Sequence, residues 1–320
     1  MNTYPDLSEV LASLNVVRLP MRTRFRGIDH REVALFEGPY GWGEFSPFLE
    51  YGSEESSWWL RAGLEAAFEA PSPLLRDQIE INATLPELDE ASEIQAVLDL
   101  YPGTKTVKIK VSEDVERSRA RIATVREISP SITIRLDVNG GWSADQAVAF
   151  LEPISEGIEY VEQPCATIEE LREVKRRIGV KIAADEVVRK SQDPFAIDLF
   201  EAADLLVLKV SPLGGIKRSR EIAAHHKLPV AVSSALESGV GIAHGLRLAA
   251  SIPDYHRASG LGTGALFTDD VVKSKIEDGR MRVSGIATLD RLTLDRLAVE
   301  SDRFKWWQNR VRASYEVLEG

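Results

Sequence analysis

From residue 79 onward the sequence alternates short apolar segments with longer amphipathic ones, about one pair every 25 residues. The apolar segments predict eight strands, at 79–83, 106–111, 132–137, 158–162, 180–184, 204–210, 229–233 and 257–261. Helical patterns lie between them, at 115–128, 145–154, 168–178, 216–226 and 240–250. Strands that alternate with helices form a parallel sheet, and eight such units indicate an α/β barrel that closes on itself.

The first 76 residues have a different character. Short β-rich runs at 15–19, 31–36 and 41–45 follow one another with glycine-containing turns, as in a meander. A helix is predicted to begin at Ser53 and to end near Ala70, before Pro71 and Pro73. Residues 1–76 are therefore expected to form a separate α+β unit, and residues 77–265 the barrel.

The alternation of strands and helices fades after Gly264. The remaining segment, about 266–320, is charged and contains Trp306 and Trp307. Tryptophans in a tail suit docking onto another part of the fold, so we expect this segment to pack against the N-terminal unit.

Composition excludes several classes of function. The chain has 39 Lys and Arg against 50 Asp and Glu, a net charge of −11, which argues against binding to nucleic acid. The single cysteine, Cys165, cannot form an intramolecular disulfide. The first ten residues resemble no signal peptide, and no apolar run reaches the roughly 20 residues that span a bilayer. These features predict a cytoplasmic protein without a membrane partner, and they leave its oligomeric state open.

Charged residues recur where successive predicted strands end. The spacings from Lys110 onward are 27, 25, 23 and 24 residues, one charged position for each unit. Any one of them has an ordinary alternative, as a helix cap, a carboxylate at the rim or edge-strand protection. The active sites of such barrels lie at the C-terminal ends of the strands, so the recurrence favours a functional site. Its members are Lys108, Lys110, Asp137 with Asn139, Glu162, Asp185 with Glu186, and Lys209.

The three acidic strand ends, Asp137, Glu162 and Asp185, are candidate metal ligands. Carboxylates that converge repel one another unless a cation lies between them. Hard oxygen ligands without histidine or cysteine suit Mg²⁺, with Mn²⁺ as an alternative. Lysines beside such a metal are candidate bases, so the set predicts proton abstraction next to a carboxylate group, with the metal stabilising the negative charge that develops.

This constellation resembles the enolase superfamily, and the resemblance covers nearly the whole chain. It implies a modified TIM barrel, (β/α)7β, with an α+β N-terminal capping domain. Thr106-x-Lys108-x-Lys110 together with Lys209 is similar to the pattern of the muconate lactonizing subgroup. By the same resemblance, the metal ligands are Asp137, Glu162 and Asp185.

Three reactions share these lysines: cycloisomerisation of muconate, epimerisation of dipeptides, and dehydration to o-succinylbenzoate. The eighth predicted strand has no Asp-x-Asp to hold an ammonium group, but a glycine loop with Gly262 and Thr263. The seventh ends in Ser233 and Ser234, which is similar to the o-succinylbenzoate-forming branch. The resemblance therefore implies Mg²⁺-dependent syn dehydration of 2-succinyl-6-hydroxy-2,4-cyclohexadiene-1-carboxylate in menaquinone biosynthesis, with a small-molecule carboxylate as substrate.

The resemblance also implies roles for single residues. Lys110 would be the acid and base, Lys209 would stabilise the anionic intermediate, and Lys108 would lower the pKa of Lys110. Arg135 is expected to support the carboxylates. Substrate contacts are expected from Asn139, Ser233, Ser234, Gly262, Thr263 and Arg24. Two alternatives stay open: an N-acylamino acid racemase or dipeptide epimerase of the same superfamily, and a barrel without catalytic activity.

Overall fold

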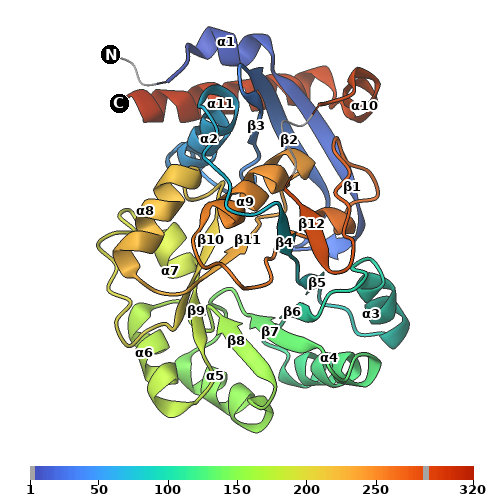
Figure 1. The fold of residues 1–320 in the computed structure, drawn as a ribbon, viewed down its shortest axis with the longest axis vertical. Helices are drawn as coiled ribbons and strands as arrows, with labels where there is room; N and C mark the ends of the chain where they lie inside the picture. The colour runs from blue at the N-terminus through green and yellow to red at the C-terminus, as the bar shows by residue number, and fades with distance from the viewer. Residues whose placement is uncertain (1–3, 284–287) are drawn as a thin grey trace.

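The computed structural model describes residues 4–283 and 288–320. Near the N-terminus, three antiparallel strands form a sheet in the order β1 (Asn15–Phe25), β2 (Ile28–Gly38) and β3 (Gly41–Phe45). Helix α1 (Leu7–Ala12) precedes this sheet and α2 (Ser53–Phe68) follows it. In Figure 1 this unit lies at the top, above a barrel of parallel strands. It corresponds to the expected capping domain.

The hairpin between β1 and β2 is longer than predicted. Residues 20–25, which follow the predicted run 15–19, belong to β1, and only Arg26 and Gly27 connect Phe25 to its partner Ile28. Both connecting residues have positive φ, 50° and 77°, as the tightest hairpin turns require. Glycine adopts this conformation freely, whereas Arg26 does so against its steric preference.

The barrel contains seven parallel strands that neighbour one another in chain order. They are β5 (Ala83–Leu85), β6 (Thr106–Lys110), β7 (Thr133–Asp137), β8 (Ile158–Glu162), β9 (Ile182–Ala184), β10 (Leu205–Lys209) and β11 (Val230–Ser233). The connecting helices are α3 (Ala91–Leu98), α4 (Val115–Ile128), α5 (Ala144–Leu151) with a 3-10 turn (Glu152–Ile154), α6 (Ile168–Arg177), α7 (Glu186–Arg189), α8 (Ile216–His226) and α9 (Gly239–Ser251). Capping boxes at Ser143 with Gln146 and at Thr167 with Glu170 begin α5 and α6.

The eighth predicted strand, 257–261, is not a regular strand. The segment closes the barrel through single pairings, Ser259 with Ile81 and Gly260 with Ser233. Ser259 N–H donates to Glu80 O at 2.7 Å, and Gly260 N–H donates to Val232 O at 2.9 Å. The chain then turns into a 3-10 helix (Thr263–Leu266), so the ladder extends no further.

The first predicted strand, 79–83, is divided between two sheets. Strand β4 (Gln78–Glu80) pairs antiparallel with β12 (Arg280–Arg282), and only β5 belongs to the barrel. The two residues between them change partner, since Ile81 N–H donates to Gly279 O and Asn82 N–H donates to Ser259 O.

The C-terminal part of the chain returns to the N-terminal sheet. Helix α10 (Arg291–Leu297) lies near β1, and α11 (Ser301–Glu319) packs against α2 and crosses the top of the molecule in Figure 1. Trp307 is buried, meets Phe45 edge-on at 5.9 Å and donates its indole N–H to Glu32 at 2.9 Å. The limits of 1–76, 77–265 and 266–320 for the parts of the chain stay a prediction.

A layer of side chains fills the barrel interior and consists of Tyr160, Ala183, Leu205, Val207 and Ala231. On β8, Tyr160 lies two residues before Glu162, so both point inward and Glu162 lies nearer the C-terminal end of the strand. The interior is therefore packed below the charged residues. Among the described residues, no helix is both long and apolar enough to cross a membrane.

Candidate active site

The charged strand ends lie side by side because neighbouring strands are in register. Lys110 of β6 pairs with Asp137 of β7, and Asp137 pairs with Glu162 of β8. Lys108 and Lys110 are two residues apart, so both point into the barrel. The recurrence of charge in the sequence thus corresponds to one cluster at the barrel mouth.

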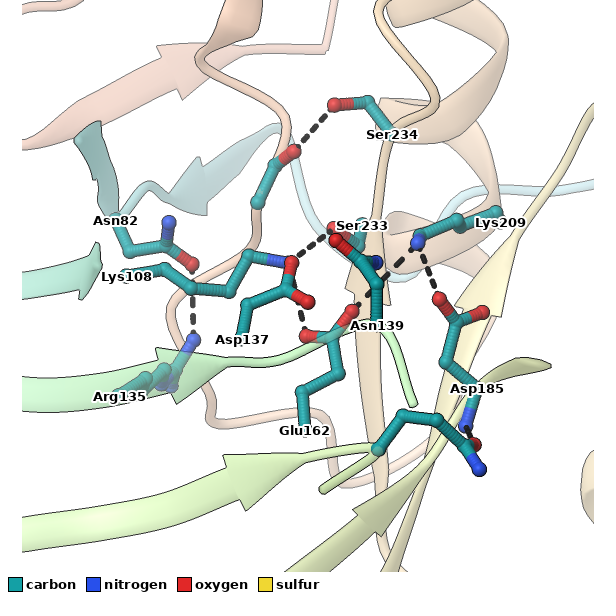
Figure 2. Close-up of polar contacts among 12 residues, drawn as sticks. Asn82, Lys108, Arg135, Asp137, Asn139, Glu162, Asp185, Lys209, Ser233 and Ser234 are labelled. Carbon is teal, nitrogen blue, oxygen red and sulfur yellow. Dashed lines mark hydrogen bonds and ion pairs between the residues drawn. The ribbon is translucent and has the colours of Figure 1, made fainter. Parts of the chain in front are cut away.

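Lys108 and Lys110 both contact Asp137, and Lys108 also contacts Glu162. Lys110 Nζ lies 2.6 Å from Asp137 Oδ2, and Lys108 Nζ lies 3.1 Å from the same oxygen. Lys108 Nζ also lies 2.8 Å from Glu162 Oε2 and 3.4 Å from the Ser233 hydroxyl. Figure 2 shows Lys108 between Glu162 and Ser233. Because Lys108 has two acidic neighbours and Lys110 has one, their electrostatic environments differ.

Lys209 lies on the other side of the cluster. Its Nζ is 2.5 Å from Asp185 Oδ2 and 3.5 Å from Glu162 Oε1. Arg189 Nε donates to the second oxygen of Asp185 at 2.9 Å, and the same guanidinium donates to Glu186 at 2.6 Å. Arg189 was not among the predicted site residues, and the available signal was its position four residues after Asp185, which precedes a helix.

The lysines differ in the direction of their pKa shifts. Burial lowers the pKa of Lys110, helped by the positive charges of Lys108 and Lys209, although Asp137 opposes the change. Burial also disfavours the ammonium form of Lys108, but Asp137 and Glu162 outweigh it and raise its pKa. For Lys209, Asp185 and Glu162 outweigh burial in the same way. Of the three, only Lys110 is shifted toward the neutral amine, the form that can accept a proton.

The three carboxylates also differ in the direction of their pKa shifts. Burial raises the pKa of Asp137 and Asp185 taken alone, but nearby cations overcome this and lower both values. These cations are Lys108 and Lys110 at Asp137, and Arg189 and Lys209 at Asp185. Glu162 has a raised pKa because of its burial and the negative charge of Asp137.

Arg135 does not support the carboxylates, contrary to prediction. It lies one inward position before Asp137 on β7, below the charged cluster. Its guanidinium donates to Glu159 at 2.7 Å, Asn82 Oδ1 at 2.9 Å and Ala258 O at 2.6 Å. Figure 2 shows its contact with Asn82, away from Asp185. Arg135 therefore joins β7 and β8 to the segments that close the barrel.

Four of the expected substrate contacts line a common cavity with the lysines: Asn139, Ser233, Ser234 and Thr263. Lys110 Nζ donates to Asn139 Oδ1 at 2.5 Å, and the hydroxyls of Ser234 and Thr263 lie 2.8 Å apart. Gly262 does not line this cavity, because its Cα packs on Ile81 and Tyr101.

Arg24, a predicted substrate contact, does not line the cavity. Arg24 is exposed and donates to Gly27 O at 3.0 Å, whereas Phe25 and Arg26 line the cavity. The extension of β1 to Phe25 turns Arg24 to the opposite face from Phe25. Phe48 and Trp59 of the N-terminal unit complete the wall. The cavity measures about 30 Å³, room for a single water molecule, so a larger ligand requires these side chains to move.

Comparison with known families agrees with this geometry. A family model described as enolase C-terminal domain-like matches residues 91–286, and one described as enolase N-terminal domain-like matches residues 16–67. The chain belongs to the enolase superfamily.

Within this superfamily, curated relatives align with almost the whole chain. The o-succinylbenzoate synthase of Mycobacterium tuberculosis is 48% identical over 324 residues, which cover 98% of this chain and 97% of the relative. That of Mycobacterium ulcerans is 48% identical over 326 residues, with 99% and 96% covered. Among solved structures, the muconate lactonizing enzyme of Pseudomonas fluorescens has the same fold, with a TM-score of 0.77, 20% identity, and 90% of this chain and 98% of that chain covered.

Membership of the superfamily implies a divalent metal ion, and the acidic side chains fit one. Among the described residues, nothing donates a hydrogen bond to the buried Asp137 Oδ1 or Glu162 Oε1, although Lys209 Nζ lies 3.5 Å from Glu162 Oε1. Such oxygens are costly to bury unless a cation or donor reaches them. As the described residues stand, no three acidic, histidine or cysteine side chains enclose an ion site, and Lys108 and Lys209 lie between the carboxylates. Binding of a metal would therefore displace lysine ammonium groups from these oxygens.

Proposed function

We propose that this protein is an o-succinylbenzoate synthase, a hydro-lyase that converts 2-succinyl-6-hydroxy-2,4-cyclohexadiene-1-carboxylate to 2-succinylbenzoate. The observation that carries the proposal is a pair of lysines, the partly buried Lys110 and the buried Lys209, which line one cavity, with only Lys110 of the two shifted toward the neutral amine. Relatives of that name at 48% identity over the full length favour this reaction over the others of the superfamily. We place it in menaquinone biosynthesis in the cytoplasm, as the sequence predicted.

Lys110 would carry both proton transfers. Its neutral amine removes the proton from the ring carbon that bears the carboxylate, and the C–H electron pair moves into the bond to the carboxylate, whose oxygens take up the negative charge until the pair returns to the ring as the hydroxyl leaves. The ammonium so formed then protonates the hydroxyl, which leaves as water when the C–O bond breaks. One residue on one face serves both steps, which gives a syn elimination, and the product is aromatic.

Lys209 and Lys108 would act by charge. Their acidic neighbours raise the pKa of each, so both remain ammonium groups. Fixed positive charge in a buried site stabilises negative charge that develops on the substrate. Lys209 faces the intermediate from across the cavity, and Lys108 keeps the pKa of Lys110 low.

Asp137, Glu162 and Asp185 would hold Mg²⁺, with Mn²⁺ as an alternative, because buried carboxylate oxygens are hard ligands. When bound, the ion supplies positive charge that stabilises the charge developing on the substrate carboxylate. The hydroxyls of Ser234 and Thr263 and the guanidinium of Arg26 are polar groups of the cavity that would bind the succinyl chain.

The test is to incubate the purified protein with Mg²⁺ and the cyclohexadiene carboxylate, and to measure 2-succinylbenzoate by chromatography and mass spectrometry. We expect product that disappears with excess chelator and with Lys110→Ala. The same preparation is assayed for exchange of the α-proton of N-succinylamino acids in D₂O. Exchange without dehydration would replace the proposal with a racemase, and neither activity would favour a non-catalytic barrel.

A further inference from the structure

A second cavity lies between the N-terminal unit and the outside of the barrel. It measures about 450 Å³ and shares no lining residue with the catalytic cavity. Its walls come from the turn between β2 and β3, the end of α2, and helices α8 and α9. In Figure 1 these helices lie together at the left and centre of the molecule. Small-molecule sites typically have volumes of about 300–1,000 Å³, so this cavity is large enough for one.

One half-buried charged group in the wall has no partner among the described residues. Arg247 of α9 is half-buried, and within residues 4–283 and 288–320 its guanidinium makes no hydrogen bond or ion pair. Burial lowers its pKa, which indicates that the charge is partly removed from water. A partly desolvated guanidinium without a counter-ion can gain a strong bidentate interaction with a carboxylate.

The acid nearest the interior is not available to Arg247. Glu65 of α2 accepts hydrogen bonds from Ile216 N–H at 2.6 Å and Lys217 N–H at 3.3 Å, and its carboxylate lies 3.4 Å from His244 Nε2. The other charged groups of the wall are two cations and two acids, all of them exposed, and such charges are screened by solvent. These are Lys217 and Arg220 with Glu69 and Glu221. The inner part of the cavity thus has one uncompensated positive charge.

The remaining wall is apolar and partly aromatic. Tyr40 and Trp42 come from the N-terminal unit, and Val240 and Ala243 come from α9. We propose that this cavity is a second ligand site, which binds a small aromatic carboxylate with its anionic group on Arg247 and its ring against Trp42. The ligand would touch both β3 and α9, so it would stabilise the contact between the N-terminal unit and the barrel.

Calorimetry on the full-length protein, with 2-naphthoate as probe and uncharged 2-naphthamide for comparison, tests this. Arg247→Gln should weaken 2-naphthoate binding by about tenfold or more, the scale of one charge-assisted hydrogen bond. Ala243→Leu, which fills the cavity, should weaken binding of either compound. The matched control is Arg312→Gln, at an exposed arginine of α11, and it should bind 2-naphthoate as the unmodified protein does.

Lys209→Ala separates the two cavities. If it removes 2-naphthoate binding while Arg247→Gln does not, the probe occupies the catalytic cavity and the proposal is wrong. Equal binding of 2-naphthamide would exclude the role of Arg247. Absence of binding at millimolar 2-naphthoate would exclude the site. Circular dichroism of each variant establishes that it is folded, and Arg247→Gln should keep the dehydratase activity.

Discussion

At the scale of single residues, the two lysines of β6 have the same functional group, and their surroundings shift their pKa values in opposite directions. Lys108 contacts two carboxylates and Lys110 contacts one. The effect of burial is therefore larger at Lys110 and lowers its pKa, whereas attraction to the carboxylates is larger at Lys108 and raises its pKa. The side chain nearer the mouth is the better base, and the deeper one is the better fixed charge.

Replacing Lys110 should therefore remove a proton carrier, and replacing Lys108 should remove a charge. We expect Lys110→Ala to lower kcat by about a thousandfold and to recover part of it when methylamine is added. Lys108→Ala should lose activity without recovery by methylamine. Lys105→Ala, at an exposed position just before the same strand, is the control and should leave kcat unchanged. Equal recovery of both variants would contradict the division of roles.

Arg26 and Arg24 provide a matched pair for the substrate contact. Arg26 lines the cavity with its guanidinium 4.2 Å from the centre of the Phe48 ring, and Arg24 is turned away. We expect Arg26→Gln to raise KM about tenfold with little change in kcat, because it binds the substrate without taking part in the proton transfers. Arg24→Gln should change neither constant. Steady-state kinetics of the two variants test this. A raised KM for Arg24→Gln with no change for Arg26→Gln would show that Arg24 is the substrate contact.

The sequence predicted which charged side chains would meet, because parallel strands in a barrel present their ends at one mouth. It did not predict how deep in the barrel each inward-pointing side chain lies. Arg135 and Asp137 both point inward, but only depth within the barrel tells that Arg135 belongs to the layer beneath. The prediction for Arg24 was wrong because successive residues of a strand point to opposite faces, and the prediction for Gly262 was wrong because that glycine lies against Ile81 and Tyr101.

At the scale of elements, the barrel closes where its secondary structure is weakest. The seam between β11 and β5 is made by single pairings at Ser259 and Gly260. Arg135 compensates for this, because its guanidinium bonds Asn82 and Ala258 on the two sides of the seam. A regular pattern in the sequence predicted eight equal strands, whereas glycines and the partner change at Ile81 and Asn82 shorten the ladder there.

Removing Arg135 should consequently open the seam. Arg135→Met would leave Glu159 and the Ala258 carbonyl without their donor, and we expect it to lower the free energy of unfolding by about 3–5 kcal/mol. Arg257→Met is the control, since Arg257 lies 3.9 Å from the same Glu159 but is more exposed, and its loss should cost about 1 kcal/mol or less. Urea denaturation measures both. If both variants lost about 1 kcal/mol or less of the free energy of unfolding, Arg135 would not stabilise the closure of the barrel.

At the scale of the whole molecule, one buried carboxylate fastens the N-terminal unit to the barrel. Glu44 of β3 accepts from the Ser238 hydroxyl at 2.6 Å and from Gly241 N–H at 2.9 Å, at the start of α9. Burial and the neighbouring Glu237 raise the pKa of Glu44 to about 7, and burial and Glu44 raise the pKa of Asp270 to about 7. Arg31 is the buried cation that faces this group of acids.

These shifts predict how stability depends on pH. A carboxyl group with a raised pKa in the folded state stabilises the fold fully below its unfolded pKa, and this contribution is lost as pH rises through about 7. We expect the free energy of unfolding to fall by about 2 kcal/mol between pH 5 and pH 7 from this source. Glu44→Gln, which mimics the protonated group, should reduce the fall, and Glu54→Gln, at an exposed position of α2, should not. Denaturation at several pH values gives the slopes, and parallel slopes for all three proteins would refute the assignment.

The helix that covers the N-terminal sheet is made after the barrel. Trp307 follows Glu32, its hydrogen-bond acceptor, by 275 residues. During synthesis, the strands of the N-terminal sheet leave the ribosome long before α11, so the barrel can form while that sheet still lacks its cover. Contacts between residues so distant in sequence form late. A ribosome stalled between the end of the barrel and α11 would therefore hold a chain whose barrel sequence is complete and whose N-terminal sheet still lacks its cover.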